Sequence, residues 1–180
     1  MSLATFQIGL VLERRAPVTR WGETTWLPHA ALMPPPDAKP WTPLGREGGA
    51  ELFYAGVASV ELFKSGTGNY RDNLVTGAPK LWVVLRPSGP APPVEVVLVT
   101  ADPSEGESQT EAGEQVVDAV PMPPELAAAL AAFVEAHHLE QPFHKRQRKR
   151  YDPEVMASRP GGRKPGGGGA SGRKPGSEEN

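Results

Sequence analysis

Arginine and tryptophan side chains gather near the N-terminus in a pattern suited to binding an anionic ligand or a partner protein. Arg14 and Arg15 are adjacent, and Trp21 and Trp26 follow them. Guanidinium groups bind phosphates and carboxylates in a bidentate way, while tryptophans either contact a partner or fill a small core. We expect most of the tryptophans, Trp41 included, to fill the core, because a small domain has few other large residues.

A second polar group occupies a short segment downstream, where Asn69, Tyr70, Arg71 and Asn73 fall within five residues. Such a group predicts a recognition surface. The alternative is that the amide side chains cap a helix. We take these four residues as candidate contacts beside the N-terminal group.

The densest run of positive charge supplies a third set of candidate contacts, namely Lys145, Arg146, Arg148, Lys149 and Arg150. The run predicts electrostatic contact with nucleic acid or with an acidic protein. A solvated helical extension that keeps the protein soluble is the alternative. Aromatic residues are not interleaved with these charges, which argues against single-strand binding by stacking.

The histidine spacing does not predict a metal site. His137 and His138 are adjacent, so on a helix their side chains point about 100° apart and cannot share a metal as an i, i+4 pair does. His137 remains a candidate binding residue at a helix C-terminus, where positive charge is favoured. The absence of cysteine excludes disulfides, thiolate metal sites and cysteine nucleophiles. We assign no metal ligand and no cofactor.

No residue is assigned a catalytic role. Residues 64–68, Lys-Ser-Gly-Thr-Gly, lack the spaced glycines and terminal Gly-Lys-Ser/Thr of a phosphate loop, so a turn after a strand explains them. The carboxylates Glu105, Glu107, Glu111 and Glu114 lie in a Ser/Gly/Glu stretch typical of a solvated loop. A protein that acts by contact is therefore expected rather than an enzyme.

Composition and charge divide the chain. Its 180 residues suit one domain, but 20 glycines and 21 prolines indicate that folded and unfolded parts are mixed. Residues 144–180 hold ten Lys/Arg against four Asp/Glu, whereas residues 1–143 are acidic. We predict a folded domain over 1–143, a basic helical extension over 144–156 and a disordered tail over 157–180. Neither a signal peptide nor a run of ~18 apolar residues is found, so we expect a cytoplasmic protein without membrane insertion.

Hydrophobic patterning predicts an α+β fold. Residues 6–12, 26–32, 51–56, 57–63, 81–86, 94–100 and 116–120 read as strands, and 81–86 with 94–100 read as a hairpin. Short helical turns are expected over 69–75 and 104–110. Residues 124–139 form the one strong helix, with Leu126, Leu130, Phe133 and Val134 on one stripe. We expect this helix to pack on a curved, mainly antiparallel sheet, with a partly open barrel as the alternative.

Several separated motifs resemble one uncharacterised proteobacterial family, a domain of unknown function. They are Val11-Leu12-Glu13-Arg14-Arg15, Trp21, Trp26, Tyr54-Ala55-Gly56, the segment from Asn69 to Leu74, Val120-Pro121-Met122-Pro123, the helix that ends in His137-His138, and Pro142-Phe143-His144-Lys145-Arg146. The resemblance covers Phe6 to Pro153 and omits the Gly/Pro/Arg/Lys tail. Genes of this family tend to lie beside those for molybdenum-dependent formate dehydrogenase, and members are sometimes labelled molybdopterin-guanine dinucleotide biosynthesis proteins.

The resemblance implies a non-enzymatic accessory or maturation factor that binds a formate dehydrogenase subunit or one of that enzyme's maturation proteins. One alternative is an enzyme that processes a molybdopterin nucleotide, with phosphates on Arg14, Arg15 and Arg71. Nucleotidyltransferases, however, begin with a Gly-rich loop after the first strand, and residues 12–17 here are Leu-Glu-Arg-Arg-Ala-Pro. The other alternative is a nucleic-acid-binding regulator that uses the basic segment.

Overall fold

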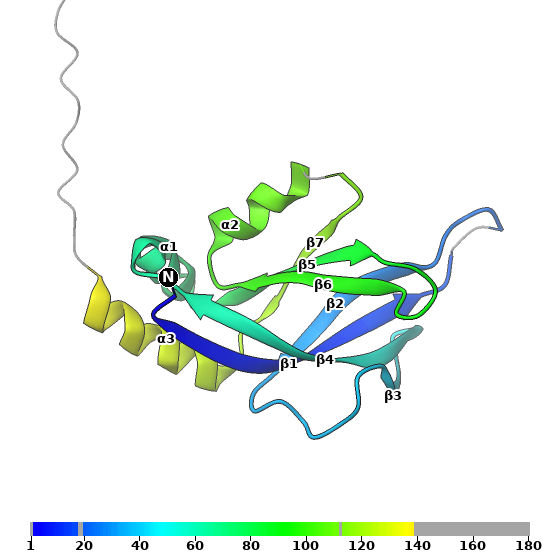
Figure 1. Ribbon diagram of the computed structural model, residues 1–180, viewed down its shortest axis with the longest axis horizontal. Helices are drawn as coiled ribbons and strands as arrows, with labels where there is room; N and C mark the ends of the chain where they lie inside the picture. Colours follow the sequence, from blue (N-terminus) through cyan, green and yellow to red (C-terminus); the bar gives the residue numbers. More distant parts are fainter. Residues whose placement is uncertain (1, 18–19, 112, 139–180) are drawn as a thin grey trace, which may run out of the picture. The chain divides into compact units, whose positions relative to one another are not determined.

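Seven strands and three α-helices follow one another in the computed structural model, which describes residues 2–17, 20–111 and 113–138 (Figure 1). The strands are β1 (Ala4–Arg15), β2 (Thr25–Leu32), β3 (Thr42–Glu47), β4 (Ala50–Leu62), β5 (Lys80–Pro87), β6 (Val94–Thr100) and β7 (Val116–Pro121). The helices are α1 (Thr67–Val75), α2 (Pro103–Ser108) and α3 (Pro124–His137), with short 3-10 turns at Lys64–Gly66 and Gln109–Glu111. The basic extension and tail predicted from 144 onward lie outside the described residues.

The strands form two antiparallel sheets, one in the order β2-β1-β4-β3 and the other in the order β6-β5-β7. β1 and β4 are the longest strands and pair along nearly their whole length, from Ala4 opposite Leu62 to Arg14 opposite Glu51. The predicted α+β class with antiparallel strands and a C-terminal helix is confirmed. The predicted 81–86 and 94–100 hairpin is also present, as β5 paired with β6.

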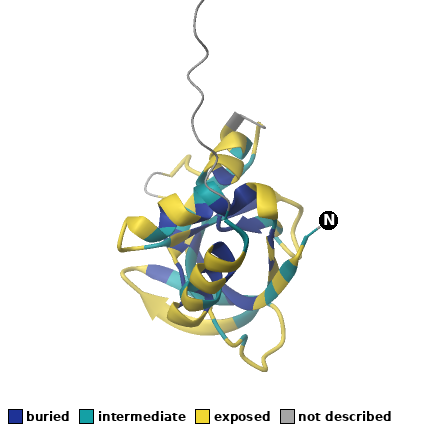
Figure 2. Ribbon diagram, turned by 90° about the vertical axis from the view of Figure 1, so that its left-hand side faces the viewer, coloured by how far each residue is buried: buried dark blue, intermediate teal, exposed yellow. Residues whose placement is uncertain are grey.

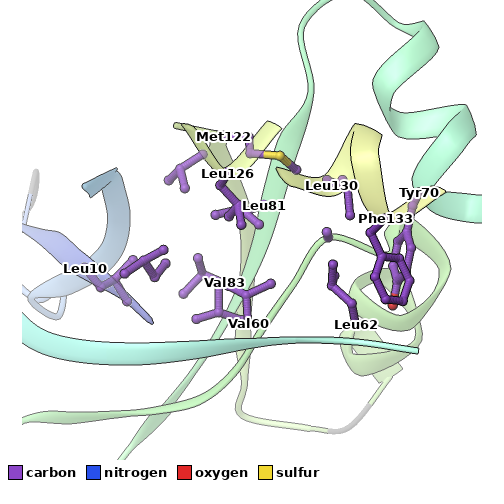
Figure 3. Close-up of a cluster of buried hydrophobic side chains, with 14 of the residues drawn as sticks. Leu10, Val60, Leu62, Tyr70, Leu81, Val83, Met122, Leu126, Leu130 and Phe133 are labelled. Carbon is purple, nitrogen blue, oxygen red and sulfur yellow. The ribbon is translucent and has the colours of Figure 1, made fainter. Parts of the chain in front are cut away.

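The core lies between the two sheets and α3, and Figure 2 shows buried residues on the strands and helices around it. Alternate residues of β1, including Leu10 and Leu12, are fully buried there, as period-two patterning requires. Figure 3 shows Leu126 and Leu130 of α3 beside Leu81 of β5, so the predicted helix stripe does contact the sheet.

A second packed layer covers the outer face of β1 and β4. Tyr54 is 1% exposed and its hydroxyl donates a hydrogen bond to the Pro36 carbonyl, 3.3 Å away. Gly9 makes this approach sterically feasible, because a Cβ at that position would lie 2.6 Å from Pro36 Cδ and 2.9 Å from the Tyr54 ring. The proline-rich segment after β2 therefore packs against a glycine notch in β1.

Strand β3 was not predicted from the sequence. Pro43 and Gly45 interrupt any alternation of apolar and polar residues within it. Its pairing with the start of β4 is set by Gly48 and Gly49, which both have positive φ, 57° and 84°, in the two-residue turn between them. This Gly-Gly pair is a hairpin signal of its own, and β3 follows from it rather than from hydrophobicity.

No helix among residues 2–17, 20–111 and 113–138 is long and apolar enough to cross a membrane.

Replacement Gly9→Ala should destabilise the protein by about 1–3 kcal/mol, because the new methyl group overpacks the Pro36–Tyr54 contact. The matched control is Gly68→Ala on α1, where a Cβ meets nothing within 4 Å and helix propensity improves. Urea unfolding of both variants measures the difference. Equal midpoints for Gly9→Ala and the unchanged protein would show that the outer layer is not tightly packed.

Candidate binding site

One apolar hollow of about 560 Å³ lies where the ends of β1, β2 and β4 meet the β5–β6 connection. We call it the aromatic groove. Its lining residues are Arg14, Thr24, Trp26, Trp41, Phe53, Pro90, Ala91, Pro92 and Pro93. Aromatic and proline side chains dominate this set, so the groove offers rigid apolar surface at little cost in side-chain entropy.

The aromatic rings of the groove hold one another in place. Trp26 meets Trp41 edge-on at 5.6 Å between ring centroids and meets Phe53 at 5.3 Å. Such edge and tilted pairs stabilise aromatic clusters beyond simple burial. The three rings are thus positioned before any partner arrives.

Arg14 is the one cation among the described residues that line the groove, and its charge is already engaged. Its guanidinium carbon lies 5.3 Å from the Phe53 ring and 5.9 Å from the Trp26 ring. Its Nε donates to Glu51, 2.8 Å away, and Arg46 bonds the same carboxylate. Hydrogen bonds from Arg14 and Arg46 hold the pKa of Glu51 below its usual value. Arg14 therefore stacks against the aromatic rings of the groove, and its charge is paired with that of Glu51.

Trp41 takes a backbone conformation that few bulky residues adopt, with φ at 67°. Its N–H donates to the Tyr54 carbonyl at 2.5 Å, which fixes the segment against β4. Backbone strain of this kind gathers at binding sites, where surrounding packing maintains it. The strain at Trp41 thus marks the groove as a candidate functional site.

The expectation that most of the tryptophans fill the core does not extend to Trp21, which was also chosen as a candidate contact residue. Its side chain is 88% exposed in the β1–β2 connection, and Arg20 lies 5.5 Å from its ring. Trp26 and Trp41 do pack against the core, partly buried. The tryptophans therefore divide between core and surface, with Trp21 on the connection that precedes Thr24 of the groove wall.

Arg15 lies on the opposite face of β1 from Arg14, because successive strand residues alternate. There it bonds Glu13 at 2.6 Å, and Nδ1 of His29 lies 3.0 Å from the same carboxylate. The other ring nitrogen of His29 lies 3.4 Å from Glu47. Burial tends to raise the pKa of Glu13, but the bonds from Arg15 and His29 outweigh it and hold that pKa below its usual value.

Two of the candidate contact residues on α1 are internal. Tyr70 is 1% exposed, its hydroxyl accepts a hydrogen bond from the Phe63 N–H at 3.2 Å, and burial raises its pKa. Asn73 is 3% exposed; its amide donates to the carbonyls of Lys80 and Ala101 and accepts from the Lys80 N–H. Neither side chain presents a surface to a partner.

The Asn69 side chain also makes an internal contact, donating to both carboxylate oxygens of Asp102 at 2.9 Å. Asp102 caps α2 by accepting from the backbone N–H groups of Ser104 and Glu105. The polar side chains of α1 thus connect this helix to β5, to the cap of α2 and to the residues that directly follow β4 and β6. The helix-capping alternative does not describe Asn69 and Asn73, because both bond residues of other segments and neither caps its own helix.

Arg71 is exposed on α1, and His137 is half-buried in the last turn of α3. Arg71 Nη1 is 3.1 Å from His138 Nε2, and the other ring nitrogen of His138 is 3.2 Å from Thr67. The His137 ring lies 4.6 Å from that of Phe133. Among the described residues, no group of three His, Asp or Glu side chains is arranged to hold a metal ion.

The structure separates the candidate residues by position along β1. Arg14 and Trp26 lie at the Glu51 end of the β1–β4 ladder, whereas Tyr70 contacts Phe63, next to the Leu62 end. These ends are roughly 33 Å apart at 3.3 Å per residue. Arg14, Arg15 and Arg71 do not converge on one point. The basic candidates Lys145, Arg146, Arg148, Lys149 and Arg150 lie outside the described residues, so their role stays a prediction.

Sequence reasoning missed several lining residues of the groove. Phe53 lies within a predicted strand, and the segment from Pro90 to Pro93 was read only as a turn. Trp41 was noted but not chosen as a contact. Its position directly after Pro40, in proline-rich sequence, was a usable signal of a tryptophan in irregular backbone.

Replacement Asn73→Ala should destabilise the fold by about 2–3 kcal/mol, because it removes three hydrogen bonds to the backbone of Lys80 and Ala101, one of them buried. Asp72→Ala, one residue away and exposed, should cost less than about 1 kcal/mol. Thermal or urea unfolding compares the two. A similar loss in both variants would contradict the internal role of Asn73.

The lowered pKa of Glu13 predicts an acid-sensitive contribution to stability. The ionised carboxylate stabilises the fold above the usual value of 4.5, and this is lost as pH falls through the lower folded-state pKa. Unfolding free energy measured between about pH 6 and pH 2 should fall less in Glu13→Gln than in the unchanged protein. Parallel curves would show that the bonds to Arg15 and His29 contribute nothing.

Comparison with known families gives a match over most of the chain. Residues 7–147 match the model of the family DUF3305, described as a protein of unknown function. This agrees with the resemblance to a domain-of-unknown-function family seen in the sequence motifs. No curated protein and no solved structure matches the chain.

Proposed function

The chain belongs to the DUF3305 family of proteins of unknown function, and we propose that it acts by binding another protein. The observation that carries the proposal is the aromatic groove, flanked by the connection that bears Trp21. Tryptophan, arginine and tyrosine dominate the residues that supply binding energy at protein interfaces. A preassembled cluster of Trp26, Trp41, Phe53 and Arg14 has this composition.

The electrostatics of the groove favour a polypeptide over a phosphorylated ligand. Arg14 already bonds Glu51, so the guanidinium of this lining residue is paired with a carboxylate. A phosphate arriving there would have to compete with the Glu51 carboxylate. Apolar side chains of a protein partner can instead cover the Trp26, Trp41 and Phe53 rings without disturbing that ion pair.

We further propose that the partner is a formate dehydrogenase subunit or one of that enzyme's maturation proteins. This part rests on the family resemblance alone, through the position of family genes beside those of molybdenum-dependent formate dehydrogenase. In this role the chain is an accessory or maturation factor that binds an apo-subunit or an assembly intermediate. It contributes contact surface, and any chemistry belongs to the partner.

Replacement Trp21→Ala should weaken partner binding by about 30-fold, the loss typical of an interface hot spot, while leaving the fold intact because the ring is 88% exposed. Co-purification of tagged protein from cells expressing formate dehydrogenase gives the readout. The control is Val75→Ala, which removes another exposed apolar side chain (77%) from α1, outside the lining of the groove.

Recovery of formate dehydrogenase subunits with Val75→Ala but not with Trp21→Ala is the expected result. Equal recovery with both variants would remove Trp21 from the interface. Failure of the unchanged protein to recover any subunit or maturation protein of that enzyme would contradict the choice of partner.

A further inference from the structure

Four residues form one row across the four-stranded sheet, at the end that carries the aromatic groove. Arg14 of β1 lies opposite Trp26 of β2 and opposite Glu51 of β4. Glu51 in turn lies opposite Arg46 of β3. Adjacent strands are about 4.8 Å apart, so the row spans roughly 14 Å from Trp26 to Arg46. Each side chain of the row contacts the next, so all four lie on one face of the sheet.

A second hollow, of about 270 Å³, lies at the Arg46 end of this row, and we call it the arginine hollow. Its lining residues are Arg14, Ala16, Thr24, Arg46, Gly49 and Glu51. Arg14 and Thr24 also line the aromatic groove, so the two hollows are neighbours. One extended ligand can therefore occupy both.

The described residues that line the two hollows carry a surplus of one positive charge. Arg14 and Arg46 are both paired with the carboxylate of Glu51. The Arg46 side chain is 77% exposed and bonds Glu51 through one terminal nitrogen, whereas a guanidinium carries five N–H donors. Arg46 therefore keeps donors for a partner's acceptor. One carboxylate from a partner balances the surplus charge, and a lysine or arginine increases it.

The aromatic end of the row has a lining suited to a proline-rich segment. Trp26 and Trp41 are half-buried, so part of each side chain is accessible. The β5–β6 connection beside them supplies Pro90, Pro92 and Pro93 (Figure 1). Proline-rich segments form polyproline II helices, which bind aromatic-lined grooves at low entropic cost because they are already extended.

The spacing of the row matches the repeat of a polyproline II helix. Residues i and i+3 of such a helix lie on the same side, about 9 Å apart. Trp26 and Glu51 are two strand spacings apart, roughly 10 Å, and the Arg46 guanidinium bonds Glu51. A proline that packs on Trp26 therefore places the residue three positions away beside Arg46.

We propose that the aromatic groove and the arginine hollow together bind a proline-rich segment of the partner protein, in which an acidic residue lies three positions from a proline. The proline packs against Trp26 and Trp41, and the acidic side chain bonds Arg46. This inference rests on the proposed function, because it names the partner chemistry that the aromatic groove recognises. It does not depend on which enzyme the partner serves.

The test uses the full-length protein and a fluorescent synthetic peptide with blocked ends, six prolines between two glutamates. A glutamate at each end allows either chain direction. Anisotropy should show saturable binding below about 1 mM. The same peptide with lysines in place of the glutamates should bind about tenfold more weakly. One with a Gly-Ser repeat in place of the prolines should not bind, because it lacks the apolar contacts and loses more entropy on binding.

Matched variants locate the site. Arg46→Glu reverses the sign of the surplus charge on an exposed side chain, so it should weaken binding of the glutamate peptide about tenfold and favour the lysine peptide. Lys80→Glu makes the same change of charge at the exposed start of β5, outside the lining of both hollows, and should leave the preference for glutamate unchanged. Amide exchange in the unchanged protein should slow in residues 24–26, 41–42 and 46–51 when the glutamate peptide binds.

Three outcomes would overturn the proposal. The first is no saturable binding of the glutamate peptide at about 1 mM. The second is equal binding of the Gly-Ser peptide, or an unchanged preference for glutamate in Arg46→Glu. The third is a different occupant: a second copy, if the unchanged protein forms a dimer in sedimentation that Arg46→Glu dissociates, or the chain's own tail, if a peptide of residues 171–177 binds more tightly than the glutamate peptide.

The peptide assay and the co-purification fail independently. If the glutamate peptide does not bind while formate dehydrogenase subunits still co-purify in a Trp21-dependent way, this inference is wrong and the proposed function stands. If the peptide binds as expected while no such subunit co-purifies, this inference stands and the choice of partner is wrong.

Discussion

The antiparallel pairing of β1 with β4 is the constraint on which the rest of the structure depends. It runs from Ala4 opposite Leu62 to Arg14 opposite Glu51 and carries a different feature at each end. At one end it brings together Arg14 and Phe53, two residues that line the aromatic groove. At the other it delivers the chain to α1, where Tyr70 and Asn73 join the two sheets.

Local patterns in the sequence were sufficient for most elements. These elements depend on residues that are neighbours in the chain, so hydrophobic periodicity and strand or helix propensity reveal them. Examples are the alternation in β1, the β-branched runs of β5 and β6, and the apolar stripe of α3. The division into two sheets depends instead on pairings between segments far apart in the sequence, such as β1 with β4 and β5 with β7, which have no local periodicity.

The candidate site was predictable only in part, for the same reason. Arg14, Trp21 and Trp26 were recognisable from residue type, but alternation placed Arg15 on the other face, beside Glu13. Polarity on α1 suggested a surface, whereas the fold uses Asn73 internally. Residue type indicates which groups a side chain can bind. Only the tertiary contacts decide whether those groups belong to this protein or to a partner.

A single claim underlies the functional interpretation, namely that this protein works through the aromatic groove and Trp21 as a contact surface. Amide hydrogen exchange of the full chain, with and without purified apo formate dehydrogenase catalytic subunit, tests it most directly. Slower exchange confined to residues 20–26, 41–42 and the 88–93 connection is the predicted result. Binding that leaves those segments unprotected and protects the outer side of α1 and α3 instead would contradict it.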